Sequence, residues 1–101
     1  MKRVVITGAG TINALGHTVN ETFEAMREGR CGIAPVTFRD VERLSIQIGG
    51  QVRNFTPKGV FNRQQLVLYD RFTQFSLLAA KEALEQSGLV FTGELAATSG
   101  V

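Results

Sequence analysis

One predicted helix constrains the fold of this chain more than any other feature. Residues 70–87 (D-R-F-T-Q-F-S-L-L-A-A-K-E-A-L-E-Q-S) contain good helix formers, with Asp70 as N-cap and Gly88 as the residue that ends the helix. Apolar side chains point round most of its circumference, namely Phe75, Leu77, Leu78, Ala79 and Ala80. A surface helix carries a single apolar stripe. We therefore expect an α/β protein in which this helix is covered on two sides, although 101 residues can hardly supply both layers.

Charge and hydropathy exclude two classes of partner. The chain has 11 basic and 9 acidic residues, and the basic ones are scattered along it, so no basic stripe points to nucleic acid. The apolar run Val4–Ile6 is too short for a signal peptide, and no stretch approaches the roughly eighteen apolar residues of a membrane-spanning helix. We expect no nucleic-acid or membrane partner.

The single cysteine, Cys31, limits the metal chemistry and suggests a compartment. One thiol cannot form an internal disulfide or a zinc site built from several thiolates. The chain therefore suits a reducing compartment, and we expect a cytoplasmic protein without a metal ion. No repeat, linker or low-complexity segment divides residues 1–101, so we expect no internal domain boundary.

The opening stretch resembles a phosphate-binding loop but departs from its pattern. Residues 3–7 predict a strand buried on both faces, and residues 8–17 predict a loop. The dinucleotide motif G-x-G-x-x-G would need glycine at position 13, where the chain has Asn13. The capping pattern Thr18-x-x-Glu21 also predicts a helix start at Val19, too late to face a phosphate. We interpret the segment as a tight loop whose glycines allow close backbone approach.

Further elements follow from local signals. The helix from Val19 should end at the Gly29 cap and turn three side chains inward, Val19, Phe23 and Met26. Residues 31–44 read as irregular, and residues 45–53 as a half-exposed strand with Ile46, Ile48 and Val52 facing inward. A turn over 56–59 leads to a short helix capped by Asn62-x-x-Gln65, and residues 92–94 read as a polar loop.

Three stretches together carry a family resemblance. V-V-I-T-G-A-G-T-I-N-A-L-G, the helix ending R-E-G-R-C-G-I, and Y-D-R-F-T-Q-F-S-L-L-A-A-K-E-A-L-E-Q-S-G-L resemble the beginning of a β-ketoacyl-acyl-carrier-protein synthase. The type resembled is the bacterial elongating synthase II with its nodulation-type relatives, and the resemblance covers essentially the whole chain. It implies a thiolase-like layered fold (α-β-α-β-α) with helix 70–87 in the central layer. It also implies that residues 1–101 are the N-terminal segment, about a quarter of the enzyme, stopping in a strand that starts near Ala97.

The resemblance also implies an activity and where its residues lie. Members of the family condense an acyl group, held as a cysteine thioester, with malonyl-carrier protein in fatty-acid or related lipid synthesis. They are acyltransferases, expected here as a homodimer without a cofactor. The family's nucleophilic cysteine and two histidines would lie beyond Val101, so no catalytic residue is expected within residues 1–101. Cys31 stands where relatives usually carry a small residue and is interpreted as a packing position, and His17 as a locally bonded or solvent-facing histidine.

Carrier-protein docking is the one function that the resemblance assigns to this segment. The family often carries an Arg-Lys-x-x-Arg-Lys run before the aspartate of the D-R-F helix. Here Arg63 matches its first position, whereas Gln64, Val67 and Leu68 replace the other basic residues. Arg63 is therefore the candidate contact for acyl- and malonyl-loaded carrier protein, and the three missing charges should weaken electrostatic steering.

Two other function classes stay open from the sequence. A non-catalytic partner of a condensing enzyme, similar to a chain-length factor, would have the same first quarter but lack the later cysteine. An NADPH-dependent reductase would instead use the glycine loop and bind NADPH measurably.

Overall fold

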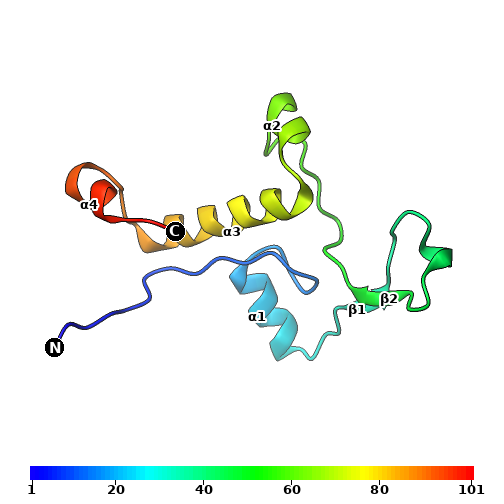
Figure 1. Cartoon of the computed structure of the whole chain (residues 1–101). Helices are drawn as coiled ribbons and strands as arrows, with labels where there is room; N and C mark the ends of the chain where they lie inside the picture. Colours follow the sequence, from blue (N-terminus) through cyan, green and yellow to red (C-terminus); the bar gives the residue numbers. More distant parts are fainter.

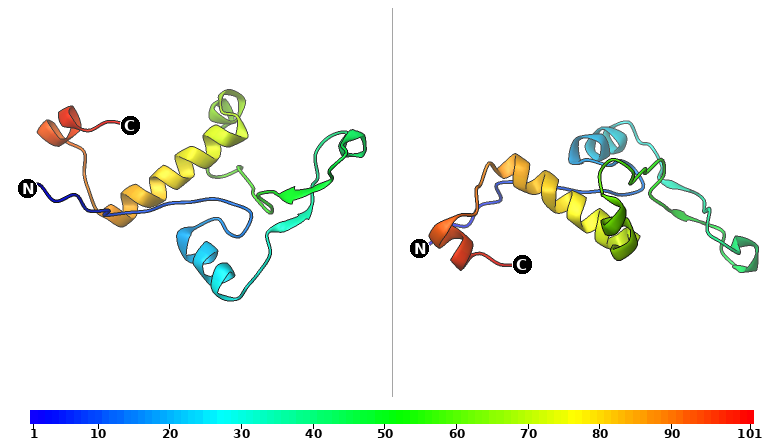
Figure 2. Two further views of the ribbon diagram at one scale, coloured as in Figure 1. Left: turned by 60° about the horizontal axis from the view of Figure 1, so that its bottom comes forward. Right: turned by 90° about the horizontal axis from the view of Figure 1, so that it is seen from above.

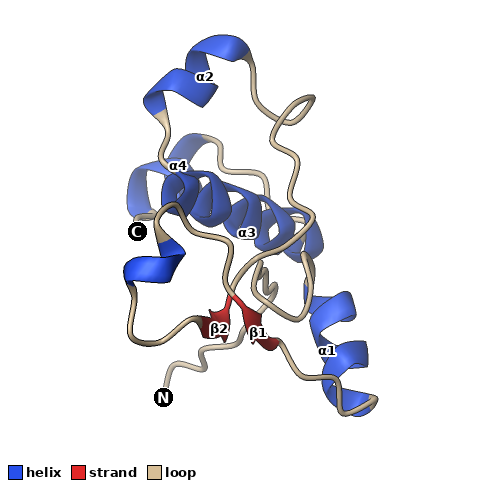
Figure 3. Ribbon diagram, turned by 90° about the vertical axis from the view of Figure 1, so that its right-hand side faces the viewer, coloured by secondary structure: helices blue, strands red, loops and turns tan.

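The computed structural model describes all 101 residues, arranged around one long helix (Figure 1). The elements in chain order are α1 (Val19–Arg27), β1 (Ile33–Pro35), the 3₁₀ helix η1 (Val41–Arg43), β2 (Ile48–Gly50), α2 (Arg63–Leu68), α3 (Arg71–Ser87) and α4 (Gly93–Thr98). The opening segment and α1 lie along one side of α3, with α2 near its start and α4 beyond its end (Figure 1). Helix therefore dominates, and the only strands are two short ones (Figure 3).

Helix α1 begins and ends where the sequence predicts. The Thr18 hydroxyl accepts from the Glu21 N–H at 3.1 Å, while the Glu21 carboxylate reaches back to the His17 N–H at 2.7 Å, one residue beyond the capping-box position. At the other end Gly29 has φ +69°, and its N–H and that of Arg30 bond to carbonyls of the last turn. This is the Schellman arrangement expected of a glycine-terminated helix.

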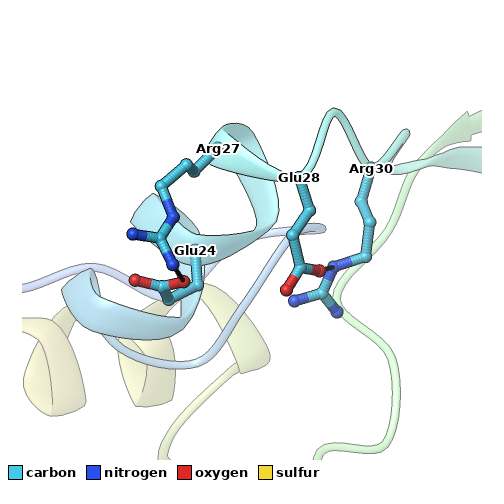
Figure 4. A network of polar contacts seen from close by, with 4 residues as sticks. All are labelled: Glu24, Arg27, Glu28 and Arg30. Carbon is cyan, nitrogen blue, oxygen red and sulfur yellow. Dashed lines mark ion pairs between the residues drawn. The ribbon is translucent and has the colours of Figure 1, made fainter.

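Two exposed ion pairs surround the end of α1 (Figure 4). Arg27 bonds Glu24 at 2.8 Å, and Arg30 bonds Glu28 at 2.9 Å. Such surface pairs contribute roughly 0–1 kcal/mol each. They also leave the two arginines neutralised by their neighbours.

The apolar face predicted for α1 is only partly correct. Val19 is half-buried, but Phe23 and Met26 are 63% and 65% exposed, and Ala25 is the residue with no exposed surface. The loop before the helix contacts it at Thr22, whose hydroxyl accepts from the Asn13 amide, and no other helix or strand packs against it. This contact is not broad enough to bury Phe23 and Met26.

Helices α2 and α3 also follow their local signals. The side chains of Asn62 and Gln65 form both bonds of a capping box at the start of α2. Asp70 is the N-cap residue of α3 in extended backbone, although its side chain makes no capping bond. Gly88 ends α3 with φ +67°.

The strand predicted for residues 3–7 is wrong. The segment is extended but pairs with no other strand, and Val4 and Ile6 are 95% and 92% exposed. It runs past the end of α3 into the loop beneath that helix (Figure 2). A strand requires a neighbour for its backbone N–H and C=O groups, and no other extended segment of this chain lies beside it.

The strand predicted for residues 45–53 is shortened to β2. It pairs antiparallel with β1 in the register Ile33↔Gly50 and Pro35↔Ile48, so the stretch read as irregular in fact supplies β1 and η1. Pro35 is tolerated because this two-stranded sheet has only edge strands. Ile46 and Ile48 are 72% and 60% exposed, which contradicts their predicted inward orientation.

The surroundings of α3 and the chain beyond it differ from expectation. Leu77 and Leu84 on α3 are 44% and 46% exposed, so the helix is covered on one side and not on two. Residues 93–98 form α4 where a polar loop and then a strand near Ala97 were predicted, because the stretch E-L-A-A favours helix and no neighbouring strand competes for it. The whole chain has only three buried residues, Ala25, Val36 and Gln74.

Candidate functional site

The glycines of the opening loop lie directly against α3. A Cβ atom added at Gly8 would sit 2.1 Å from the Ala83 carbonyl oxygen, and one at Gly10 would sit 1.8 Å from the Ala79 carbonyl oxygen. No side chain fits at either distance. These glycines therefore permit loop and helix backbones to touch.

The backbone N–H groups of this loop already have partners on α3. The Ala9 N–H donates to Gln86 Oε1 at 2.7 Å, and the Thr11 N–H donates to Glu82 Oε2 at 2.9 Å. In a phosphate-binding loop such groups would point at the ligand. Here helix side chains hold them, which disfavours the nucleotide interpretation.

Asn13 organises the turn at the end of the loop. Its amide nitrogen donates to the hydroxyls of Thr11 and Thr22, both at 3.0 Å. Its carbonyl oxygen accepts from the N–H groups of Leu15 at 2.8 Å and Gly16 at 3.3 Å. The residue that breaks the dinucleotide motif is thus the one whose side chain builds the turn.

His17 bonds to a segment that is distant in the chain. Its Nε2 lies 2.7 Å from the Arg53 carbonyl oxygen, which requires Nε2 to carry the proton and donate it, and its ring meets Phe55 edge-on at 6.2 Å. Phe55 in turn packs edge-on against Phe75 of α3 at 5.0 Å between ring centroids. This aromatic row ties residues 53–56 to both the loop and α3.

Cys31 carries an exposed thiol on the chain between α1 and β1. Its sulfur accepts from the Ile33 N–H at 3.4 Å and is not hydrogen-bonded to His17. It lies with His17 and Arg53 on the lining of an open hollow of about 550 Å³. The thiol therefore has no base positioned to activate it.

Arg63 is the first residue of α2, where it is exposed and makes no ion pair. With Gln64, Val67 and Leu68 it lines a shallow hollow of about 410 Å³. Val67 and Leu68 are 83% and 76% exposed. These four positions therefore form one surface, with one charge, one amide and two apolar side chains.

No group of three or more His, Cys, Asp or Glu side chains comes together to hold a metal ion. No helix has the length and apolar character that crossing a membrane requires.

Comparison with known proteins decides the family. Residues 1–100 match the family model described as "Beta-ketoacyl synthase, N-terminal domain". This chain belongs to that family. The match includes both halves of the contact described above, the opening loop and α3.

Named relatives of this chain come from several bacteria. It is 38% identical over 88 residues to 3-oxoacyl-[acyl-carrier-protein] synthase 2 of Coxiella burnetii, covering 87% of the chain and 21% of the relative. The same enzyme of Staphylococcus aureus is 35% identical over 100 residues, covering 99% of the chain and 24% of the relative. Nodulation protein E of a Rhizobium species is 40% identical over 88 residues, covering 87% and 22%. The chain thus spans about a fifth to a quarter of these relatives.

Sequence reasoning missed the two residues of α3 that hold the opening loop, Glu82 and Gln86. The sequence indicates them only as helix formers within residues 70–87. One signal was present in the sequence. Glu82 and Gln86 lie on the same helix face as Ala79, so a face that is otherwise apolar and small carries two polar side chains. Arg63, the carrier-protein contact that the sequence suggests, is exposed and belongs to no ion pair of the structure.

Proposed function

We propose that this chain is the N-terminal part of a 3-oxoacyl-carrier-protein synthase, an acyltransferase of fatty-acid or related lipid synthesis. The observation that carries the proposal is the family match over residues 1–100, which includes the loop and helix in mutual contact. The Coxiella and Staphylococcus relatives are named as synthases of 3-oxoacyl-[acyl-carrier-protein], so their acyl carrier is a protein.

The reaction we propose has two steps. A cysteine thiolate attacks the acyl thioester and releases the carrier's thiol. Malonyl-carrier protein then loses carbon dioxide, and the resulting enolate carbon attacks the enzyme-bound thioester, forming a carbon-carbon bond and expelling the cysteine thiolate. We place that cysteine and two assisting histidines in the part of the enzyme that residues 1–101 do not span, with oxyanion stabilisation by backbone amides.

The proposal extends to the fold and the setting of the enzyme. We propose a thiolase-like layered structure with α3 in its central layer, residues 1–101 forming one N-terminal segment within it. The one-sided cover of α3 supports this, because Leu77 and Leu84 leave an apolar face for a second layer. A homodimeric, cytoplasmic enzyme without a cofactor is part of the same proposal, and the exposed free thiol of Cys31 fits a reducing compartment.

A graft tests the proposal. Residues 1–100 replace the matched 100 residues of the Staphylococcus relative, and β-ketoacyl product formation from acyl- and malonyl-carrier protein is measured. We expect a soluble chimera that forms the β-ketoacyl product. The 101-residue chain alone should catalyse no condensation and form no acyl thioester on Cys31. Cys31→Ser is the control for the thioester measurement. A chimera that melts like the relative but never forms product would contradict the proposal.

We also propose that Arg63 contacts the carrier protein. Exposure without an ion pair supports this role, since its charge is available to an acidic partner. In the graft, Arg63→Glu should raise the KM for carrier protein a few-fold with little change in kcat, because rim charges mainly affect association. Arg27→Glu is the matched control, since Arg27 is paired within α1. Equal effects of the two variants would reject Arg63 as a specific contact.

A non-catalytic partner subunit is the second candidate. Residues 1–101 do not separate it from an active synthase, but the replacement of three expected basic positions by Gln64, Val67 and Leu68 weakens the surface for an acidic carrier protein. A graft that folds, binds no carrier protein and yet raises the activity of an added synthase would favour this candidate. The reductase alternative requires NADPH binding, and the occupied amides of the loop argue against it.

A further inference from the structure

One carboxylate links two backbone segments that are separate in the chain. Glu82 Oε2 accepts from the Thr11 N–H at 2.9 Å, and Glu82 Oε1 accepts from the Val19 N–H at 2.8 Å. Both bonds are part-buried. A single side chain of α3 therefore fixes both the glycine loop and the start of α1.

The Val19 N–H is one of the backbone donors at a helix start, which usually lack a hydrogen-bond partner. It lies in the first turn of α1, where backbone donors have no carbonyl of their own helix to bond. The helix dipole adds a partial positive charge at that end, which favours an anion. The carboxylate of Glu82 supplies that anion from within the chain.

No basic side chain takes part in holding this carboxylate. The nearest lysine in sequence, Lys81, pairs with Glu85 at 3.8 Å, and Glu82 belongs to none of the ion pairs of the structure. The backbone N–H groups of Thr11 and Val19 stabilise its negative charge instead. Charge-assisted bonds of this kind are roughly twice as strong as neutral ones.

We propose that the amides of Thr11 and Val19 form an intramolecular carboxylate-binding site, and that Glu82 is its resident ligand. Glu82 is then the positioning residue for the loop and α1 on α3. Because the site recognises a carboxylate by its two oxygens, it should accept a free small carboxylate such as formate once the side chain is removed. This inference is independent of the activity proposed above.

The test is carboxylate rescue in the full 101-residue chain at low concentration. Backbone amide exchange of residues 9–20 is followed by mass spectrometry, in sodium formate and in sodium chloride of equal ionic strength. Native protein should protect the Thr11 and Val19 amides in both salts. Glu82→Ala should lose at least tenfold in protection in chloride and regain most of it, saturably, in formate.

Two further variants separate this proposal from a general loss of structure. Gln86→Ala removes only the bond to Ala9, so the protection of Thr11 and Val19 should persist without formate. Glu82→Gln keeps the shape but only one acceptor oxygen, so it should lose protection at one of the two amides.

Three outcomes would overturn the proposal. The first is the absence of protection at Thr11 and Val19 in the native chain. The second is a Glu82→Ala chain that formate restores no better than chloride does. The third is a Glu82→Gln chain in which both amides stay protected. A Glu82→Ala chain that unfolds in chloride and regains protection only in formate would support it.

Discussion

The two faces of α3 are covered in different ways. The face toward the opening loop carries glycine contacts, two loop bonds from Glu82 and Gln86, and the ring of Phe75 against Phe55. The opposite face carries Leu77 and Leu84, seven residues apart and partly exposed. One face is therefore specified by individual bonds, whereas the other offers only apolar surface.

The two faces therefore contribute differently to the position of the loop and to the stability of the chain. Glycine contacts and polar bonds fix where the loop lies, because each has a narrow geometry. Burial of apolar side chains provides most of the driving force for folding, and only three residues of the chain are buried. The loop-facing side of α3 is thus held by specific contacts, whereas its apolar side stays exposed.

The largest effect should come from adding a side-chain atom between the opening loop and α3. Gly10→Ala places a Cβ where the Ala79 carbonyl oxygen stands, 1.8 Å away, so the loop must leave the helix. We expect a loss of about 1–3 kcal/mol, read as amide-exchange protection across residues 8–16. Gly100→Ala is the matched control, since nothing lies within 4 Å of its added Cβ. Unchanged protection in Gly10→Ala would show that the loop does not depend on this contact.

A smaller effect should follow from removing the side chain that builds the turn. Asn13→Ala loses the amide bonds to Thr11 and Thr22 and leaves the N–H groups of Leu15 and Gly16 without their acceptor. The cost should be about 1–2 kcal/mol, because the groups are only part-buried and water replaces some bonds. The same exchange measurement checks it. A loss confined to residues 15 and 16 would mean that the threonine bonds contribute nothing.

Local signals predicted the helix ends well. Thr18 and Asn62 cap α1 and α2, and Gly29 and Gly88 end α1 and α3, as expected. These features depend on hydrogen bonds or backbone angles within a few residues, so the sequence contains everything needed to infer them. The capping box at Asn62 was predicted to the residue.

Strands and the site were harder to predict because they depend on distant segments. Residues 3–7 have the β-branched composition of a strand, yet a strand exists only when another chain segment pairs with it. The bonds of Glu82 likewise require the loop to approach α3 from more than 60 residues away in the chain. No local pattern predicts such an approach, and the only sign of it in the sequence is the pair of polar residues, Glu82 and Gln86, on an otherwise small and apolar face of α3.

The smallest effect on the isolated chain should come from the open face of α3, and it tests the proposed layered fold most directly. Leu77→Lys removes an apolar side chain that is 44% exposed, so it should change the free energy of unfolding of the 101-residue chain by less than about 0.5 kcal/mol. Its solubility should rise, because the apolar patch shrinks.

In the graft with the Staphylococcus relative the same Leu77→Lys substitution should be strongly destabilising, since a second layer would bury the position and leave the ammonium without a partner. Leu78→Lys is the control, because Leu78 is already half-buried and lines the same hollow as Phe55, so this substitution should destabilise both proteins. Melting curves of the four variants give the comparison. A graft that tolerates Leu77→Lys as well as the isolated chain does would mean that this face of α3 stays open in the enzyme, and the central-layer proposal would fail with it.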